Sequence, residues 1–357
     1  MNAANRALEL SLDNEDPYLR AEALLSALFW QVICNGWNAV YFEECTKAIF
    51  ELEKGAEPLA LAQGKTKYAM LQFMSSQYRE GLLSLDSGIP ILASNGDVSF
   101  HAGQINRVWL LIFSGEWGKA LEKVHTQIEF AVKEENVIRE NMWRVQLAWI
   151  HQQALDYTHS AELCRQARIA LLDPGVAAAR RDCLILEGNA ETNLGKLAQA
   201  RKHLAEAALL QDHPRTLMDW YWKMPLYQAE IDLALQIGDV NKARHAAEKC
   251  LSASLATDEH TWRARAWEAD ARVANAEGDL ARAKESIENA IAEMKEMDLP
   301  LAHWRVHVTA MMLIPENAEY HRMLAVETIL RLASSLDGYP SLQDTFHSSP
   351  IFQNVLG

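Results

Sequence analysis

One pattern of polar and apolar positions returns along most of this chain. A turn residue is followed five residues later by a small residue and thirteen residues later by an aliphatic one, as in GDLARAKESIENAI, residues 278–291. The turn residues lie 39 to 43 residues apart, at Gly36, Ser76, Gly115, Asp156, Gly195, Gly238 and Gly278. A period this regular predicts an array of structural repeats.

The spacing predicts a helical hairpin in each repeat. The fifth positions after the turns are small in six of the seven repeats, as expected where two helices approach closely: Tyr41, Gly81, Ala120, Ala161, Ala200, Ala243 and Ala283. An apolar stretch with helical periodicity precedes each turn, for example over residues 261–277. One such hairpin cannot bury its apolar face alone, so the repeats must stack on one another.

The pattern continues beyond the seventh turn. Residues 301–313 have the pattern of a first helix of an eighth hairpin, and Pro315 opens the second helix. We therefore expect an all-α, right-handed superhelical solenoid of about eight helix-turn-helix hairpins with a period of ~40 residues. The expected organisation is a lead-in over residues 1–17, a single continuous array over 18–335 and a C-terminal cap over 336–357.

The predicted hairpins resemble tetratricopeptide repeats. The large, small and packing positions of that family coincide with Trp267, Ala271, Ala274, Ala283, Ile287 and Ala290. The period here is longer than the ~34 residues usual in the family, which implies longer helices. The end of the chain, from LPLAHWRVHV through LQDTFHSSPIFQNVL, resembles the end of the helical arrays on maltose-regulator-type and cyclase-fused signalling ATPases. The sequence contains no ATPase, cyclase or DNA-binding part of such proteins.

Composition and charge narrow the class of partner. The formal net charge is -14, and such a surface repels phosphate backbones and anionic lipids, so we expect neither a nucleic-acid partner nor a membrane. No apolar run approaches the ~18 residues of a membrane helix, and the first residues lack the segments of a signal peptide. The five cysteines are scattered, which favours packing residues in a reducing compartment. We therefore expect a cytoplasmic protein.

No catalytic or metal-binding motif is complete. The Gly-Lys-Thr at Gly64–Thr66 lacks the earlier glycine of a phosphate-binding loop, because Leu59 stands there. His303 and His307 have the spacing of two metal ligands on one helix face, but Trp304 stands where metalloproteases carry Glu. Packing or hydrogen bonding is the favoured interpretation of these histidines. We predict no enzyme activity, no cofactor and no metal.

Surface recognition is the function that remains. In tetratricopeptide arrays the first helix of each hairpin lines a concave groove, and the resemblance places groove positions three, six, ten and thirteen residues before each turn. The candidate partner-binding residues at such positions are Trp30, Phe73, Trp109, Trp143, Asn189, Arg265, Arg272 and Asn275. Arg265 and Arg272 are spaced to clamp a carboxylate, the alternative being pairs with Glu268 or Asp270. For the large aromatic residues, the alternative is packing between repeats.

These features favour a non-catalytic scaffold or adaptor that binds a peptide or partner helix in its groove. The alternative is a regulatory or sensor subunit, related to the array of a signalling ATPase, that binds a small ligand or a signalling peptide. An enclosed pocket of ligand size would favour this alternative. A basic stripe along the first helices would favour RNA recognition, and a metal held by His303 and His307 would favour an enzyme.

Overall fold

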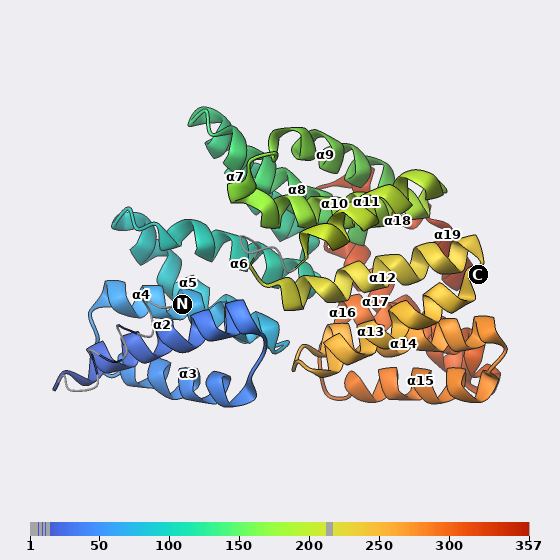
Figure 1. The fold of residues 1–357 in the computed structure, drawn as a ribbon, viewed down its shortest axis with the longest axis horizontal. Coiled ribbons are helices and arrows are strands. Elements are labelled where there is room, and N and C mark those ends of the chain that lie inside the picture. Colours follow the sequence, from blue (N-terminus) through green and yellow to red (C-terminus); the bar gives the residue numbers. More distant parts are fainter. Residues whose placement is uncertain (1–5, 7–8, 10, 12–14, 212–216, 357) are drawn as a thin grey trace. The chain divides into compact units, whose positions relative to one another are not determined.

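Figure 1 shows a computed structural model that describes Arg6, Glu9, Ser11 and residues 15–211 and 217–356. Every regular element within these residues is a helix, and consecutive helices pack as hairpins, which confirms the predicted all-α hairpin array. None of the described helices is long and apolar enough to cross a membrane. The contacts divide the chain into two compact units, and the single continuous array over residues 18–335 stays a prediction.

Unit 1 extends to Leu111 and also contains Ala256–Glu259. Its helices are α2 (Pro17–Asn35), α3 (Ala39–Leu52), α4 (Pro58–Met74), α5 (Tyr78–Ser94) and nearly all of α6 (Ser99–Phe113). The Trp37 indole donates to Asp258 Oδ2 at 2.8 Å, and the fully buried Glu259 accepts from Ser76 Oγ at 3.1 Å. Hydrogen bonds to the half-buried Asp258 and the buried Glu259 thus hold this late segment of the chain in unit 1.

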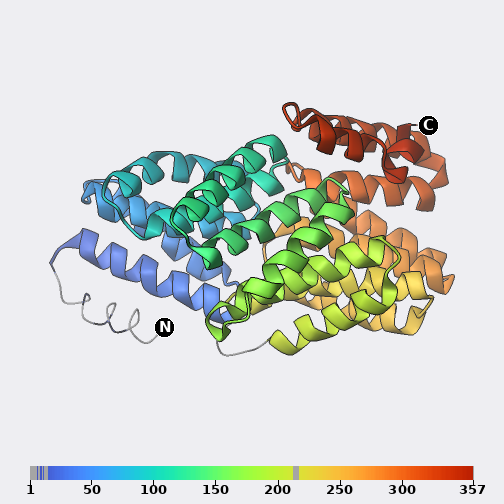
Figure 2. The ribbon, with the colours of Figure 1, turned by 90° about the horizontal axis from the view of Figure 1, so that it is seen from above.

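Unit 2 contains Ile112–Leu255 and His260–Gly357. Figure 2 shows its helices as successive pairs in chain order, coloured from green to red. The helices are α7 (Trp117–Lys133), α8 (Val137–Gln153), α9 (Tyr157–Ala170), α10 (Ala177–Asn193), α11 (Leu197–Leu210), α12 (Asp219–Ile237), α13 (Val240–Leu255), α14 (His260–Glu277), α15 (Leu280–Glu293), α16 (Pro300–Leu313), α17 (Ala318–Ser334), α18 (Pro340–His347) and α19 (Pro350–Leu356).

A left-handed residue and a helix cap build the turn inside a hairpin. At Gly278 φ is +80°, a conformation that glycine adopts without strain. The Gly278 amide donates to Asn275 O at 3.0 Å and the Asp279 amide to Ala274 O at 2.9 Å, which ends α14 in a Schellman arrangement. The Asp279 carboxylate accepts from the Arg282 amide at 3.1 Å and so caps α15. The Gly-Asp dipeptide therefore ends one helix and begins the next.

The fourth turn lies one residue earlier than the sequence pattern indicates. Its left-handed residue is Leu155, with φ +60°, and Asp156 follows as the N-cap of α9. Leu155 stands 40 residues after Gly115 and 40 residues before Gly195, which are the left-handed residues of the neighbouring turns. Every groove position expected in the fourth repeat consequently moves by one residue.

The two helices of a hairpin meet at small residues. Ala120, Ala200, Ala243 and Ala283 are all buried. Around Ala243, the alanines and other apolar residues of α12, α13 and α14 form one continuous core cluster. The absence of long side chains in these columns lets neighbouring helices approach closely enough to exclude water.

The last hairpin of unit 2 packs against its first helix. The Gly118 amide at the start of α7 donates to Ser335 O at 3.0 Å, and any side chain at Gly118 would overlap that oxygen. The fully buried Trp117 packs on Phe346 of α18, with ring centroids 5.4 Å apart. Residues more than 200 positions apart in the sequence thus pack together, and α18 and α19 occupy the segment expected to form a cap.

A cluster of histidines lies inside the α16–α17 hairpin. His303 Nδ1 lies 2.8 Å from Thr328 Oγ1, and His307 Nδ1 lies 3.0 Å from His321 Nδ1. His303 and His307 thus make hydrogen bonds within the hairpin, as favoured from the sequence. Burial, with the neighbouring His303 and His321, lowers the pKa of His307 to about 3. The native state therefore holds His307 neutral.

We predict that Ala283→Leu lowers the free energy of unfolding by about 1–3 kcal/mol, because the added volume has no space between α14 and α15. Ala281 lies in the same helix but is exposed, so Ala281→Leu should change the free energy of unfolding by less than about 0.5 kcal/mol. Urea denaturation of both variants measures the difference. If both substitutions lowered the free energy of unfolding equally, close packing at Ala283 would be contradicted.

A second prediction concerns acid stability. An unfolded histidine binds a proton near pH ~6.5, whereas His307 in the native state does so only near pH 3, so the unfolded state holds more protons between these values. Stability should therefore fall as the pH is lowered from ~6.5, by at most about 1.4 kcal/mol per pH unit for this one group. The free energy of unfolding of His307→Asn, measured from pH 7 to pH 5, should show a shallower slope than wild type.

The exposed His245 supplies the control, since His245→Asn should retain the wild-type slope. A slope that is the same in His307→Asn and wild type would show that His307 does not resist protonation.

Candidate functional site

Unit 2 contains a cavity of ≈ 640 Å³, here called the unit 2 cavity. It is lined by the first helices of five successive hairpins, α8, α10, α12, α14 and α16, together with Tyr157 of α9 and residues of α19. The involvement of first helices agrees with the expected position of the groove. A volume of this size lies within the ~300–1,000 Å³ usual for binding sites of small ligands.

Four tryptophans form much of the apolar wall, one from each of four first helices: Trp149, Trp222, Trp262 and Trp304. The rings of Trp149 and Trp222 lie 5.3 Å apart between centroids. The Trp262 indole donates to the Tyr221 hydroxyl at 2.9 Å, which fixes its ring. Such rigid aromatic surfaces contribute large contact areas at little entropic cost.

Three charged residues of the cavity form an internal network. Arg272 Nη1 donates to Asp232 Oδ1 at 2.8 Å, and Arg272 Nε lies 2.8 Å from Glu268 Oε1 in an ion pair without hydrogen-bond geometry. Thr309 Oγ1 also donates to Glu268 Oε1, at 2.7 Å. Burial alone would lower the pKa of Arg272, but Glu268 and Asp232 raise it overall. The Arg272 charge is thus compensated within the protein.

Arg265 has a different environment. No carboxylate of the described residues lies within ion-pair distance of its guanidinium, and its buried Nε has no hydrogen-bond partner there. Its Cζ lies 4.7 Å from the centroid of the Trp262 ring. Burial lowers the pKa of Arg265, although Asp232 and Glu268 oppose that change. A guanidinium stays charged under these conditions, so the site contains an incompletely compensated cation.

Arg305 on α16 resembles Arg265. It donates to Leu301 O at 2.8 Å and to Gln153 Oε1 at 3.3 Å, both uncharged acceptors, and its Cζ lies 4.2 Å from the centroid of the Trp304 ring. Burial and the positive charge of Arg265 both lower the pKa of Arg305. Two cations of one cavity therefore destabilise each other.

Three of the residues predicted from the sequence come together in the unit 2 cavity: Asn189, Arg265 and Arg272. Asn275 is exposed near the end of α14 and does not line the cavity. In unit 1, Trp30 is exposed, whereas Phe73 and Trp109 are buried with their ring centroids 5.5 Å apart. Buried rings of this kind pack the interior.

The one-residue change at the fourth turn explains why Trp149 was not among the predicted groove residues. Counting thirteen residues back from Asp156 selects Trp143, which is buried and does not line the cavity. Counting six and three residues back from Leu155 selects Trp149 and Gln152, which both do. The sequence pattern identified Asp156 as the turn residue, and it did not reveal the left-handed conformation of Leu155.

Trp304 and Arg305 were also missed as groove residues. The eighth hairpin turns through the short helix Pro315–Asn317, and no residue in that turn has a positive φ. Groove positions were counted back from recognisable turn residues, so α16 contributed none. Alignment of its apolar pattern with that of α14 would have been the available signal.

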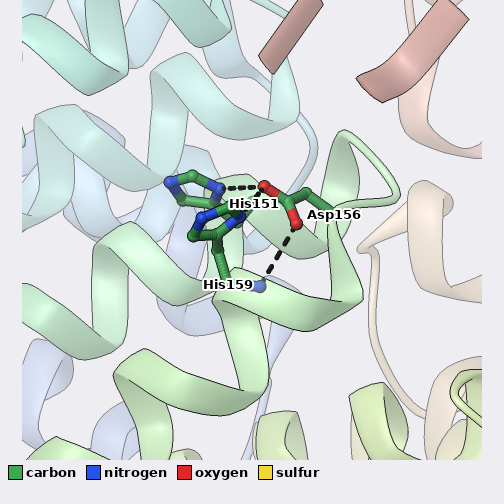
Figure 3. Close-up of side chains that lie close together, drawn as sticks. All are labelled: His151, Asp156 and His159. Carbon is green, nitrogen blue, oxygen red and sulfur yellow. Dashed lines mark hydrogen bonds and ion pairs between the residues drawn. The ribbon is translucent and has the colours of Figure 1, made fainter. Parts of the chain in front are cut away.

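Two further clusters carry residue types that bind metals. Figure 3 shows His151, Asp156 and His159 at the α8–α9 turn, where Asp156 Oδ2 lies 2.9 Å from His151 Nδ1 and 2.7 Å from His159 Nδ1. Burial alone would raise the pKa of Asp156, but hydrogen bonds from His151 and from the His159 amide lower it. These bonds, with the N-cap role of Asp156, give the first cluster a complete structural role.

The second cluster consists of Glu187, Glu191 and His203 in the α10–α11 hairpin. His203 Nδ1 lies 2.8 Å from Glu191 Oε2, and Arg168 Nε donates to Glu187 Oε2 at 2.8 Å. Both carboxylates thus already have partners within the protein. Gly64–Thr66 lies inside α4, so the Gly-Lys-Thr sequence forms no phosphate-binding loop.

A scan against protein-family models and a search of curated proteins found no match. Among solved structures, the crystal structure of Rap protein complexed with Competence and Sporulation Factor aligns with a TM-score of 0.60 and 12% identity, covering 83% of this chain and 79% of that chain. The apo form of RapI aligns with a TM-score of 0.54 and 12% identity, covering 82% of this chain and 97% of that chain. At this identity the likeness concerns the fold alone, and it agrees with an array of helical hairpins of the tetratricopeptide kind.

Proposed function

We propose that this chain is a non-catalytic binding protein that takes a short peptide into the unit 2 cavity. The observation that carries the proposal is the combination of carboxamide and aromatic side chains in one cavity. The carboxamides are Gln152, Gln153, Asn189, Asn193, Gln228, Gln236 and Asn354. A carboxamide offers both a donor and an acceptor, and so matches the peptide groups of an extended ligand. The tryptophan surfaces suit its apolar side chains.

The size of the cavity and the participation of α19 in its lining favour a receptor for a short ligand over a scaffold for a partner helix. The side chains of α19 line the cavity together with the five first helices, so α19 covers part of the groove. The similarly folded Rap protein was crystallised with Competence and Sporulation Factor, which supports a ligand role for such an array. A regulatory function in the cytoplasm, related to the arrays of signalling ATPases, belongs to this proposal.

The test is a screen of synthetic random-sequence pentapeptides and heptapeptides with free carboxyl termini, followed by calorimetric titration of the selected peptides. We expect Asn189→Ala to weaken binding by about tenfold, because one buried hydrogen bond to the peptide is lost. Asn189 Oδ1 accepts from Gln152 Nε2 at 2.7 Å, so circular dichroism should first confirm that the variant is folded.

Asn275→Ala is the matched control, since Asn275 lies on a first helix but outside the cavity. Its affinity should equal that of wild type. A screen without any bound peptide, or equal losses in the two variants, would remove the support for a peptide site here.

A further inference from the structure

The cavity contains an unusual distribution of charge for this protein. The chain carries a net charge of -14, yet the cavity lining includes Arg265, Arg272 and Arg305 against only Asp232 and Glu268. Because the two carboxylates pair with Arg272, the positive charge that remains belongs to Arg265 and Arg305. A positive site within an acidic protein focuses the electrostatic potential on small anions.

Other arginines of unit 2 show that this protein normally compensates buried guanidinium groups. Arg181 is completely buried and pairs with Asp182 and Asp219, and Arg244 pairs with Asp270 and Glu277. Removing a cation from water without a counter-charge costs several kcal/mol, so such exceptions call for an explanation in terms of a ligand. Arg265 and Arg305, which are both half-buried, are exceptions on adjacent first helices among the described residues.

A neutral donor near them also lacks a partner. Trp304 is only 3% exposed and lines the cavity, and its buried indole Nε1 has no hydrogen-bond partner among the described residues. Arg265 Nε is in the same condition. An unsatisfied buried donor is destabilising in the free protein, and an acceptor atom from a ligand would relieve it where binding shifts these side chains and exposes the donor.

We propose that Arg265, Arg305 and the Trp304 indole form a subsite for a carboxylate group of the bound ligand. Two guanidinium groups and one indole N–H supply only donors, which suits a planar carboxylate with two acceptor oxygens. Asp232 and Glu268 lie close enough to influence Arg265, and they favour a monoanion over a doubly charged phosphate. In describing the ligand as a peptide, this inference rests on the proposed function.

The cation–π contacts preorganise the subsite. The Arg265 guanidinium stacks on the Trp262 ring, and the Arg305 guanidinium stacks on the Trp304 ring. Each arginine is thus held in place by an aromatic ring of its own helix. Preorganisation reduces the entropy that is lost when a ligand binds. Asp232 on α12 and Tyr157 on α9 face both arginines from other helices, and Glu268 on α14 and Gln153 on α8 face Arg305. None of these groups forms an ion pair with Arg265 or Arg305.

The direct test uses N-acetyl-leucine as the probe and N-acetyl-leucinamide as its uncharged analogue, in separate titrations at constant ionic strength followed by tryptophan fluorescence and thermal unfolding. We expect the acid to bind and to raise Tm, because it binds only the native state. The amide should bind at least about tenfold more weakly, as should the acid to Arg265→Gln or Arg305→Gln.

Arg263→Gln is the matched control, because Arg263 lies on the same helix as Arg265 but pairs with Glu293 and does not line the cavity. It should bind the acid as wild type does. Without ligand, Arg265→Gln should keep the wild-type Tm or raise it, since the substitution removes an uncompensated charge. A large loss of Tm in the free Arg265→Gln protein would assign Arg265 a structural role and overturn the inference.

Equal binding of the acid and the amide, or tighter binding of inorganic phosphate than of N-acetyl-leucine, would also overturn it. For a peptide selected in the screen, the carboxylate that binds the subsite is identified by comparing two modified forms. One has an amidated terminus, and the other has an acidic side chain replaced by its amide. Peptide binding that survives both changes would preserve the proposed function but refute the carboxylate subsite. If N-acetyl-leucine binds in an arginine-dependent way but no peptide binds, the carboxylate subsite would be supported and the proposed peptide-binding function refuted.

Discussion

The structure depends on close contacts between helices at positions where only small residues fit. Ala120, Ala200, Ala243 and Ala283 occupy equivalent points in successive hairpins, and all are buried. A hairpin that closes in this way still exposes its remaining apolar face, and the next hairpin must cover it. Stacking is therefore a consequence of the same contact that forms each hairpin, and a row of first helices is a consequence of stacking.

Residues distant in the sequence also contact one another within unit 2. The Gly118 amide bonds to Ser335 O, and Trp117 packs on Phe346, so the first helix of unit 2 meets its last helices. The final helix, α19, contributes Ile351, Asn354 and Val355 to the cavity lining. The first helices of unit 2 and α19 thus line one cavity whose volume suits a small ligand.

The arginines of this cavity lie in two different environments. Arg272 is neutralised by Asp232 and Glu268, and it links α12 to α14. Arg265 and Arg305 rest on tryptophan rings and have no such partner among the described residues. Leaving charges uncompensated reduces the stability of the free protein, and a binding site can use that free energy when an anion arrives.

The sequence by itself determined the period, the hairpins and most turns. These features depend on interactions within a few residues, such as the left-handed Gly278 followed by the capping Asp279. The resemblance to tetratricopeptide repeats placed Asn189, Arg265 and Arg272 at groove positions counted back from glycine turns, and all three line the unit 2 cavity. In the fourth repeat the same counting started one residue late and selected Trp143, because Leu155 stands where the neighbouring turns have glycine, and leucine does not favour a left-handed conformation.

Only the tertiary structure decided which of these side chains are satisfied. Arg265 and Arg272 are seven residues apart on one helix, and the sequence treats them alike. Asp232, some 40 residues earlier, lies 2.8 Å from Arg272, whereas Arg265 has no ion pair with any residue that the structure describes. Likewise, the α16 residues Trp304 and Arg305 join the site through the stacking of α16 beside α14. Pairing of charges depends on distances between stacked helices, and local sequence patterns do not contain those distances.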